Sequence, residues 1–352
     1  MKRTLMLPLV LLGLAGVFTP GCRSEADVLP EAGVPGTVLP ANFPAPVYGP
    51  NENPPTREAF ELGRSLFYDP RLSRNGTVSC GSCHQQFVAF ANAGHDVSHG
   101  IDGRTGTRNA PALQNLRWRR GFMWDGGPNH LEVMPLAPIT NPVEMDETVE
   151  NVVGKLNADA TYRRRFQVVF GKQPIDSYQL LRALAQFTAA LTSANSRYDH
   201  FVRREAGGTL SEPELRGRAA LQQKCAGCHA TDLFTDESFR NNGLNRTFPA
   251  DSGRMHITQL ATDRGRFKVP SLRNVALTAP YMHDARFQTL LQVLDHYDHG
   301  LVESATLDPV FRQRAGQPGI SLTAQEKSDL LAFLHTLTDE AFLADKRLAE
   351  QP

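Results

Sequence analysis

CGSCH at residues 80–84 and CAGCH at residues 225–229 are the two stretches that decide the fold of this 352-residue chain. Each places two cysteines one helical turn apart, with a histidine directly after the second, which is the pattern of a c-type haem attachment site. The thiols bond covalently to the porphyrin and the histidine binds the iron. We therefore expect two haems c, held by Cys80, Cys83, His84, Cys225, Cys228 and His229.

Three other kinds of site use closely spaced cysteines: a thiol redox pair, a zinc site and a disulfide. Each of them accounts for the cysteines of both motifs. None of them accounts for a histidine that follows the second cysteine twice in one chain. The haem interpretation is the one that explains all six residues.

The charges of the chain balance, with 37 Lys and Arg against 37 Asp and Glu. A net charge of zero argues against nucleic acid or an acidic membrane surface as a partner, and it predicts weak long-range steering of a protein donor. The length suggests two domains or one large one.

The first 21 residues have the pattern of an export signal, with a basic start and an apolar run at 5–17 that is short for a membrane span. Residues 19–22 resemble a bacterial lipobox without its usual leucine, in which Cys22 would carry the lipid. A plain signal peptide with a stray thiol is the alternative. Haem c is attached outside the cytoplasm, so we expect a periplasmic protein that touches the membrane only through a lipid anchor.

Residues 22–55 contain eight prolines and predict an extended tether. Apolar residues then recur with helical spacing, and strand signals are almost absent. The glycines at 207 and 208, followed by a capping-box pattern that starts at Ser211, suggest a boundary between two domains. We expect a mainly α protein with two cytochrome c-like haem domains, at 56–206 and 207–345.

Around the haem motifs the sequence resembles the bacterial di-haem cytochrome c peroxidases, over about residues 56–340. The runs that carry the resemblance are LGR at 62–64, FYDPRLS at 67–73, RNAP at 108–111, WDG at 124–126, NPVEM at 141–145, VPSLRN at 269–274 and TAPYMHD at 278–284. The same superfamily includes the di-haem enzyme that matures tryptophan tryptophylquinone in another protein. The resemblance implies that the His84 haem binds peroxide and that the His229 haem stores and relays electrons.

The resemblance also assigns roles to two side chains. Glu144 would take a proton from the bound oxygen of peroxide and return it to the distal oxygen. Without the resemblance, Glu144 would read as a surface carboxylate at the end of a loop. Trp124 would lie between the haems as the electron bridge. Trp118 has arginines on both sides, and we expect it to belong to a surface cluster or to one that contacts a haem propionate.

Two positions near the first haem depart from the family. Met134 stands where the family usually has a glutamine; it cannot donate a strong hydrogen bond and can itself be oxidised. Ile101 stands where many members have a histidine that caps the iron until the other haem is reduced. His99, two residues away, could take the place of this capping histidine if the glycine-rich loop that carries both positions shifts. Otherwise His95 and His99 are plain loop histidines. We favour an open iron that reacts without priming.

The sixth ligand of the second haem is the third departure. Members with a methionine ligand have it 17 residues after the proline of TAPY, which is Tyr297 here, and the tryptophylquinone-forming relative also has tyrosine there. A phenolate favours Fe(III) and lowers the potential. Met282, His283 and Met255 are rival ligands, and a plain core tyrosine is the alternative.

The resemblance implies a calcium ion between the domains, bound by the side chain of Asn109 and the carbonyls of Thr278 and Pro280. Asn109 as an ordinary turn residue is the alternative. A homodimer fits the family.

Three functions follow from this sequence. The first is a peroxidase that reduces hydrogen peroxide to water with electrons from a small cytochrome c or a cupredoxin. The second is peroxide-dependent oxidation of Trp or Tyr in a partner protein, which Tyr297 and Ile101 favour. The third is a di-haem electron carrier or redox sensor without catalysis, against which Glu144 and Trp124 argue.

Overall fold

The structure is a computed structural model that describes residues 33–49, 51–312 and 316–351. The predicted export signal and Cys22 lie outside the described residues. Within these ranges the chain is mostly helical, as expected, and its sheet is one antiparallel pair, β1 (Phe239–Arg240) with β2 (Phe267–Lys268). No helix in the described part is long and apolar enough to cross a membrane.

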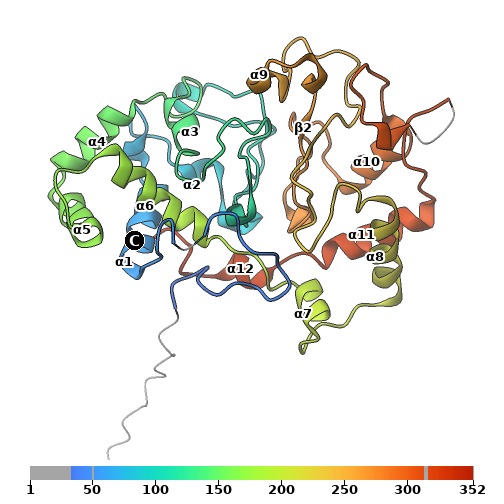
Figure 1. The fold of residues 1–352 in the computed structure, drawn as a ribbon, viewed down its shortest axis with the longest axis horizontal. Coiled ribbons are helices and arrows are strands. Elements are labelled where there is room, and N and C mark those ends of the chain that lie inside the picture. Colours follow the sequence, from blue (N-terminus) through green and yellow to red (C-terminus); the bar gives the residue numbers. More distant parts are fainter. Residues whose placement is uncertain (1–32, 50, 313–315, 352) are drawn as a thin grey trace, which may run out of the picture. The chain divides into compact units, whose positions relative to one another are not determined.

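The first half of the chain is built on a pair of helices, α1 and α6 (Figure 1). α1 begins after Thr56, whose hydroxyl accepts a hydrogen bond from the amide of Ala59 at 3.1 Å, as the sequence predicts. Gly63 lets α1 approach α6 closely, because a Cβ there would lie 2.1 Å from the carbonyl oxygen of Ala183. The α-helices of this half are α1 (Arg57–Tyr68), α2 (Cys80–Cys83), α3 (Leu136–Thr140), α4 (Val149–Ala158), α5 (Ala160–Phe170) and α6 (Ser177–Ala190).

The second half is built on a similar pair, α8 and α11. The expected capping box starts α8, where the amide of Ser211 donates to the carboxylate of Glu214 at 2.7 Å. Gly217 lies at the crossing, because a Cβ there would lie 1.9 Å from the carbonyl oxygen of Asp329. The α-helices of this half are α7 (Arg197–Arg203), α8 (Glu212–Lys224), α9 (Met255–Thr258), α10 (Leu290–Asp295), α11 (Ala324–His335) and α12 (Glu340–Ala344).

Short turns of helix join these elements. One of them, η7 (His296–Gly300), is a π-helical turn that directly continues α10. The others are 3-10 turns: η1 (Pro70–Leu72), η2 (Gln86–Val88), η3 (Ile101–Gly103), η4 (Leu116–Trp118), η5 (Ala261–Asp263), η6 (Val275–Leu277) and η8 (Pro309–Phe311).

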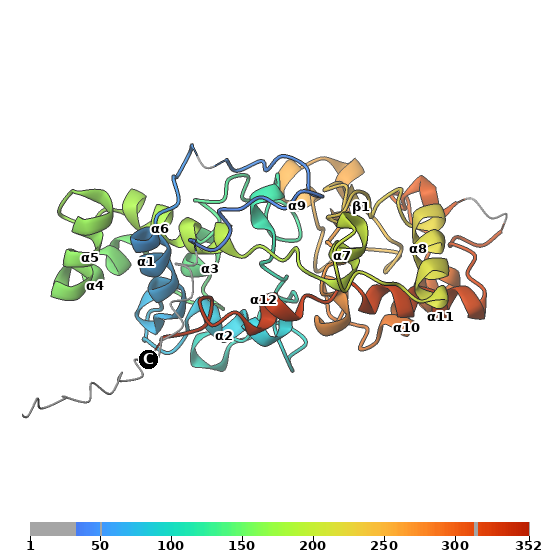
Figure 2. The same ribbon diagram turned by 90° about the horizontal axis from the view of Figure 1, so that it is seen from below.

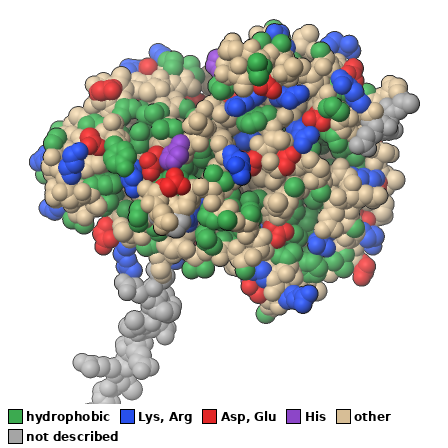
Figure 3. Space-filling view, viewed as in Figure 1, with side chains coloured by type: hydrophobic (Ala, Val, Ile, Leu, Met, Phe, Trp, Pro, Cys, Tyr) green, Lys and Arg blue, Asp and Glu red, His purple; other side chains and the backbone are tan. Residues whose placement is uncertain are grey.

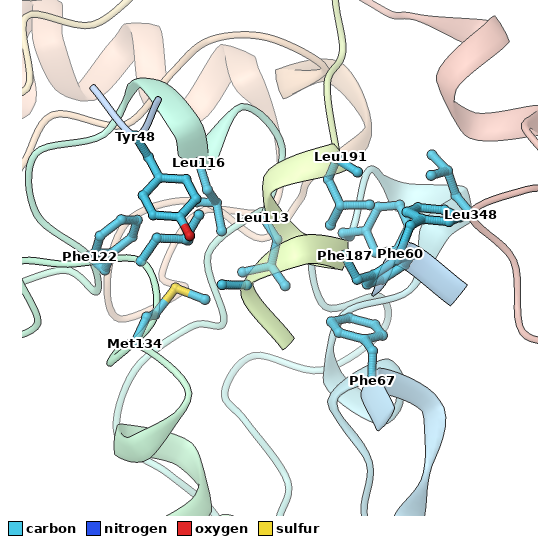
Figure 4. Packing of buried hydrophobic residues seen from close by; sticks show 14 of the residues in the cluster. Tyr48, Phe60, Phe67, Leu113, Leu116, Phe122, Met134, Phe187, Leu191 and Leu348 are labelled. Atoms are coloured by element: carbon cyan, nitrogen blue, oxygen red, sulfur yellow. The ribbon is translucent and has the colours of Figure 1, made fainter. Parts of the chain in front are cut away.

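A hydrophobic cluster in the first half joins residues that are far apart in sequence (Figure 4). Phe67 and Phe187 are tilted against each other with ring centroids 4.9 Å apart. Phe342 of α12 packs on Phe90, so the end of the chain returns to the first half (Figure 2). α7 instead packs with the second half, through Tyr198. Both helices thus pack across the expected boundary at residue 206, and the two-domain division stays a prediction.

The expected tether is wrong for the part that the structure describes. Residues 33–49 lie on the first half, where the indole nitrogen of Trp118 donates to the carbonyl of Pro44 at 2.8 Å. The ring of Phe43 packs edge-on against Trp118 with centroids 5.1 Å apart. Trp118 is therefore buried in the core and is not part of a surface cluster, because the proline-rich segment covers it.

Residues 33–49 contact a buried ion pair of the second half through Phe43. Both terminal nitrogens of Arg273 donate to the carboxylate of Asp199 at 2.8 Å, and neither side chain is exposed. The Arg273 guanidinium also lies 4.4 Å from the ring centre of Phe43, and its Nε donates to the carbonyl of Asp232 at 2.7 Å. Since a buried charge is costly unless it is paired, these contacts fix α7 and the segment after the second haem motif together.

Candidate functional site

Both haem motifs hold their histidine in the same way. The Nδ1 atom of His84 lies 2.9 Å from the carbonyl oxygen of Phe90, and that of His229 lies 3.0 Å from the carbonyl oxygen of Phe234. Such a bond makes Nδ1 the donor and leaves Nε2 as the nitrogen that can bind iron. Burial lowers the pKa of His84 to about 4 and also lowers the pKa of His229, so both rings are neutral at pH 7.

The cysteines of the motifs do not form the alternative sites. All four described cysteines are free, so neither motif is a disulfide. Burial raises the pKa of Cys80 to about 12 and that of Cys225 to about 11, whereas a thiol redox pair needs a thiolate. In the described ranges no group of three His, Cys, Asp or Glu side chains could hold a metal ion. The motifs therefore fit covalent haem.

A cavity of about 860 Å³ opens beside the first motif. Its volume is in the range of sites that enclose a cofactor-sized ligand. Residues from both halves line it, and those that carry the argument are Cys80, Cys83, His84, Arg119, Trp124, Met134, Glu144, Lys268 and Met282. The cavity thus brings the predicted peroxide-binding motif, the predicted acid–base group and the predicted electron bridge together.

Glu144 is half-buried in this cavity and is not a surface carboxylate. The side-chain amide of Asn141 donates to its Oε1 at 2.9 Å, and burial raises the pKa of the carboxyl. The backbone is fixed as well: the amide of Ile101 donates to the carbonyl of Glu144 at 2.8 Å. At Gly100 a Cβ would lie 2.1 Å from the carbonyl oxygen of Val143, so the backbone at Gly100 packs tightly against the segment that carries Glu144.

The structure also locates Met134, Ile101 and His99, the positions where the sequence departs from the family near the first haem. Met134 lines the cavity and packs beside Phe122 and Tyr48, so no amide donor stands at this place (Figure 4). Ile101 is fully buried in the hydrophobic core of the first half. His99 lines the cavity but is exposed, and its ring faces His95 with centroids 4.2 Å apart. Whether His99 caps the iron stays a prediction.

One wall of the cavity carries an excess of positive charge. Arg119 donates to Glu237 at 2.6 Å, while the Lys268 ammonium lies 3.9 Å from the same carboxylate and donates to the carbonyl of Gly121 at 2.8 Å. Arg119 and Lys268 therefore share one carboxylate, and desolvation lowers the pKa of Lys268 to about 7, so the wall has its full positive charge only below that pH. A haem carries two propionates, whose charge would balance this wall.

The other two cations that line the cavity are matched by their own carboxylates. Arg108 pairs with Asp125 and Asp251, both at 2.7 Å, and Arg273 pairs with Asp199. The sequence did not indicate Lys268 or Glu237, because their pairing joins segments that are far apart in the chain.

Trp124 is held by both halves. Its indole nitrogen donates to the carbonyl of Asn109 at 2.8 Å, and its own carbonyl accepts from the amide of Lys268 at 2.8 Å. The ring of His283 lies 6.4 Å from it and stacks on Phe267 with centroids 3.5 Å apart. Trp124 is therefore fixed at the junction, and its role as a bridge stays a prediction.

The residues expected to bind calcium meet at the same junction. The side-chain amide of Asn109 lies 2.6 Å from the carbonyl oxygen of Pro280, and its backbone amide donates to the carbonyl of His283. Thr278 is two residues before this contact. Calcium prefers oxygen ligands, and at this contact Asn109 presents its amide nitrogen to the Pro280 carbonyl, so the calcium site stays a prediction.

Tyr297 lies near the second haem motif, on the π-helical turn η7. Burial raises the pKa of its phenol to about 12, and the nearby Cys228 and Cys225 contribute to the rise. The side-chain amide of Asn242 lies 3.4 Å from the phenol oxygen and 3.3 Å from the sulfur of Met282. No sequence motif marked Asn242, since only the fold brings it to these two side chains.

Comparisons with known proteins agree with this geometry. A family model described as di-haem cytochrome c peroxidase matches residues 57–207. The chain is 35% identical over 300 residues to the methylamine utilization protein MauG of Methylorubrum extorquens, with 84% of this chain and 83% of that protein covered. It is 31% identical to the cytochrome c551 peroxidase of Nitrosomonas europaea, with 96% and 92% covered.

A solved structure is also similar. It is described as a MauG-like protein associated with microbial copper homeostasis, and it is 38% identical to this chain. The TM-score is 0.80, with 88% of this chain and 97% of that chain covered. The relatives thus include both peroxidases and proteins of the MauG type.

Proposed function

The chain belongs to the di-haem cytochrome c peroxidase family, and we propose that it reduces hydrogen peroxide to water beside the His84 motif. The observation that carries this function is the half-buried Glu144, which lies in the same cavity as that motif. The peroxidase relatives support a small cytochrome c as the electron donor, and a cupredoxin is the alternative donor. Each half of the chain would then be one cytochrome c-like haem domain.

When bound, the two haems supply an iron that binds peroxide and a store for electrons. Glu144 would do the proton chemistry: its carboxylate would accept a proton from one oxygen of peroxide and return it to the other oxygen, which leaves as water. Asn141 keeps the carboxylate in place through its 2.9 Å hydrogen bond. Burial raises the pKa of Glu144 above that of an exposed carboxyl, which makes it a stronger proton acceptor.

Trp124 would conduct electrons between the two haems. Its indole is fixed by the carbonyl of Asn109, and its backbone is bonded to Lys268 in the second half. A rigid aromatic ring at the junction is what the proposed bridge requires. The fixed ring and the shared cavity support this role.

The second candidate function is the oxidation of Trp or Tyr residues in a partner protein. Two observations favour it: the similarity to MauG proteins, and Tyr297 near the second haem motif. A non-catalytic electron carrier is disfavoured, because such a carrier does not need an acid–base carboxylate in an open cavity.

Other features complete the proposal. Calcium would bind at Asn109, Thr278 and Pro280, and the 2.6 Å contact between the Asn109 side chain and the Pro280 carbonyl supports this by bringing two of the three residues together. The protein would be exported to the periplasm, anchored through lipid on Cys22, and could pair as a homodimer. Acidic and basic side chains are interspersed over the face seen in Figure 3, which agrees with weak steering of a donor.

The deciding experiment mixes the fully oxidised holoprotein with one equivalent of hydrogen peroxide and follows the haem spectrum. We expect a fast spectral change without prior reduction, and steady oxidation of reduced cytochrome c when both substrates are present. Reaction only after one haem is reduced would show that the iron is capped, with His99 as the first candidate. No reaction in either state would overturn the peroxidase function.

A further inference from the structure

Asn242 joins Met282 and Tyr297, two side chains that are rival candidates for the sixth ligand of the second haem. Its side-chain amide lies 3.3 Å from Sδ of Met282 and 3.4 Å from Oη of Tyr297. One nitrogen therefore lies within contact distance of a thioether and a phenol. Both are groups that bind haem iron in proteins.

The backbone of Asn242 is fixed on the other side. Nε2 of His296 lies 2.9 Å from the carbonyl oxygen of Asn242, and His296 directly precedes Tyr297 in the chain. Tyr297 in turn stacks on Phe311, with ring centroids 5.7 Å apart. The turn that carries Tyr297 is π-helical, a local distortion that is frequent at functional sites.

Met282 is held in an uncommon backbone conformation. Its φ is +74°, in the left-handed region that residues with a Cβ rarely adopt. The bridge from the amide of Tyr281 to the carbonyl of Phe287, 2.7 Å long, holds the loop around it. Residues are kept in such conformations where the surrounding structure imposes them, and this happens often at ligand sites.

We propose that Met282 is a second axial ligand for the haem of the His229 motif, which binds when Tyr297 does not, with Asn242 holding both side chains in reach. A phenolate is a hard anionic ligand that favours Fe(III), and a thioether is a soft ligand that favours Fe(II). The pair would therefore exchange when the haem changes its oxidation state. The inference rests on the haem that the proposed function places at His229, and not on the peroxide reaction.

On reduction of the second haem, Met282 would replace Tyr297 as the ligand of the iron. The iron gains one electron, which the donor protein delivers, the bond to Oη of Tyr297 breaks, and a bond to Sδ of Met282 forms. A proton from water goes to Oη of Tyr297. On oxidation each of these changes is reversed.

The first test compares near-infrared and magnetic circular dichroism spectra of the oxidised holoproteins Y297F, Y297F/M282L and Y297F/M255L. Met255 lies on α9 and serves as the matched methionine control. We expect the charge-transfer band of a thioether bound to Fe(III) in Y297F and in Y297F/M255L, and its loss in Y297F/M282L. Absence of the band in Y297F, or its persistence in Y297F/M282L, would overturn the proposal.

The second test avoids the loss of Tyr297. In M282L alone, the spectrum of the oxidised second haem should be unchanged, while that of the reduced second haem should lose its thioether ligand. An unchanged reduced spectrum would overturn the proposal even if Y297F fails to fold. Peroxide turnover is measured in the same samples, so a failure of the peroxidase function is seen separately from the ligand result.

Asn242 is tested as the positioning residue by N242A. Loss of the hydrogen bond to Oη makes the phenolate of Tyr297 a stronger donor, so the reduction potential of the second haem should fall. The Y297F/N242A protein should show a weaker thioether band than Y297F, because the contact to Met282 is lost too. A potential and a band that N242A leaves unchanged would contradict this role.

Discussion

The two haem motifs orient their histidines in the same way but have different surroundings. In each, a buried histidine is oriented by the carbonyl of a phenylalanine, Phe90 for His84 and Phe234 for His229. Beside His84 there is an open cavity with the half-buried Glu144. Near the second motif, the ring of Tyr297 stacks on Phe311, and its phenol oxygen lies 3.4 Å from the side-chain amide nitrogen of Asn242. We therefore expect the attachment motif to set where a haem lies, and the surrounding side chains to decide whether its iron meets substrate or a protein ligand.

The largest test of this comparison removes the carboxylate from the first site. E144Q should lower kcat/KM for peroxide by about 10²- to 10⁴-fold, the usual contribution of general acid–base catalysis. The exposed Glu150 on α4 gives the control E150Q, which should keep full activity. Stopped-flow mixing of the oxidised holoproteins with peroxide measures both. Equal rates for E144Q and the unchanged protein would remove the chemical difference between the two sites.

The second test weakens the second half. D199N leaves the buried Arg273 without its carboxylate, which should lower the free energy of unfolding by about 3–5 kcal/mol. Denaturant titration of the holoprotein, followed at the haem band, gives the value. The partly exposed pair of Arg71 and Asp159 in the first half supplies the control D159N, for which we expect a much smaller change. Similar decreases in the free energy of unfolding of both variants would show that the buried pair stabilises the protein no more than the partly exposed one.

The third test keeps Glu144 and removes the group that holds it. N141L should lower kcat/KM by about tenfold, which corresponds to one hydrogen bond of about 1.5 kcal/mol to a charged group. The Asn141 amide lowers the pKa of Glu144, so its loss raises that pKa further. Glu144 accepts a proton in its ionised form, and the acid limb of the pH–rate profile should therefore move to higher pH. A lower rate with an unmoved profile would mean that Asn141 acts only on the fold.

The smallest expected effect concerns the positive wall of the cavity. Below pH 7, where Lys268 is protonated, K268M removes a positive charge and should lower the reduction potential of the His84 haem, because a nearby cation favours the reduced iron. The potential of the His229 haem should change less, which sharpens the difference between the sites. K172M, at an exposed lysine, is the control for a redox titration. Equal shifts in both variants would show that Lys268 does not act locally.

Several features of this protein follow from the sequence because they depend on residues a few positions apart. A haem attachment motif needs two cysteines on one helical turn, and α2 supplies that turn. The caps at Thr56 and Ser211 join residues three positions apart, so they are visible in the chain itself. Glu144 and Trp124 could be named only through the resemblance to a family, because a lone carboxylate or indole has no local pattern.

Other features depend on contacts between distant residues, and only the tertiary structure decides them. Residues 33–49 look like a free tether, yet they cover Trp118 and supply Phe43 to the buried Arg273. Asn242 reaches Tyr297 across 55 positions of sequence. Burial, charge pairing and the pKa of a side chain are set by what packs against it, and no local pattern records those neighbours. The sequence by itself determined which residues we expect to attach the haems, and the tertiary structure decided what surrounds each of these motifs.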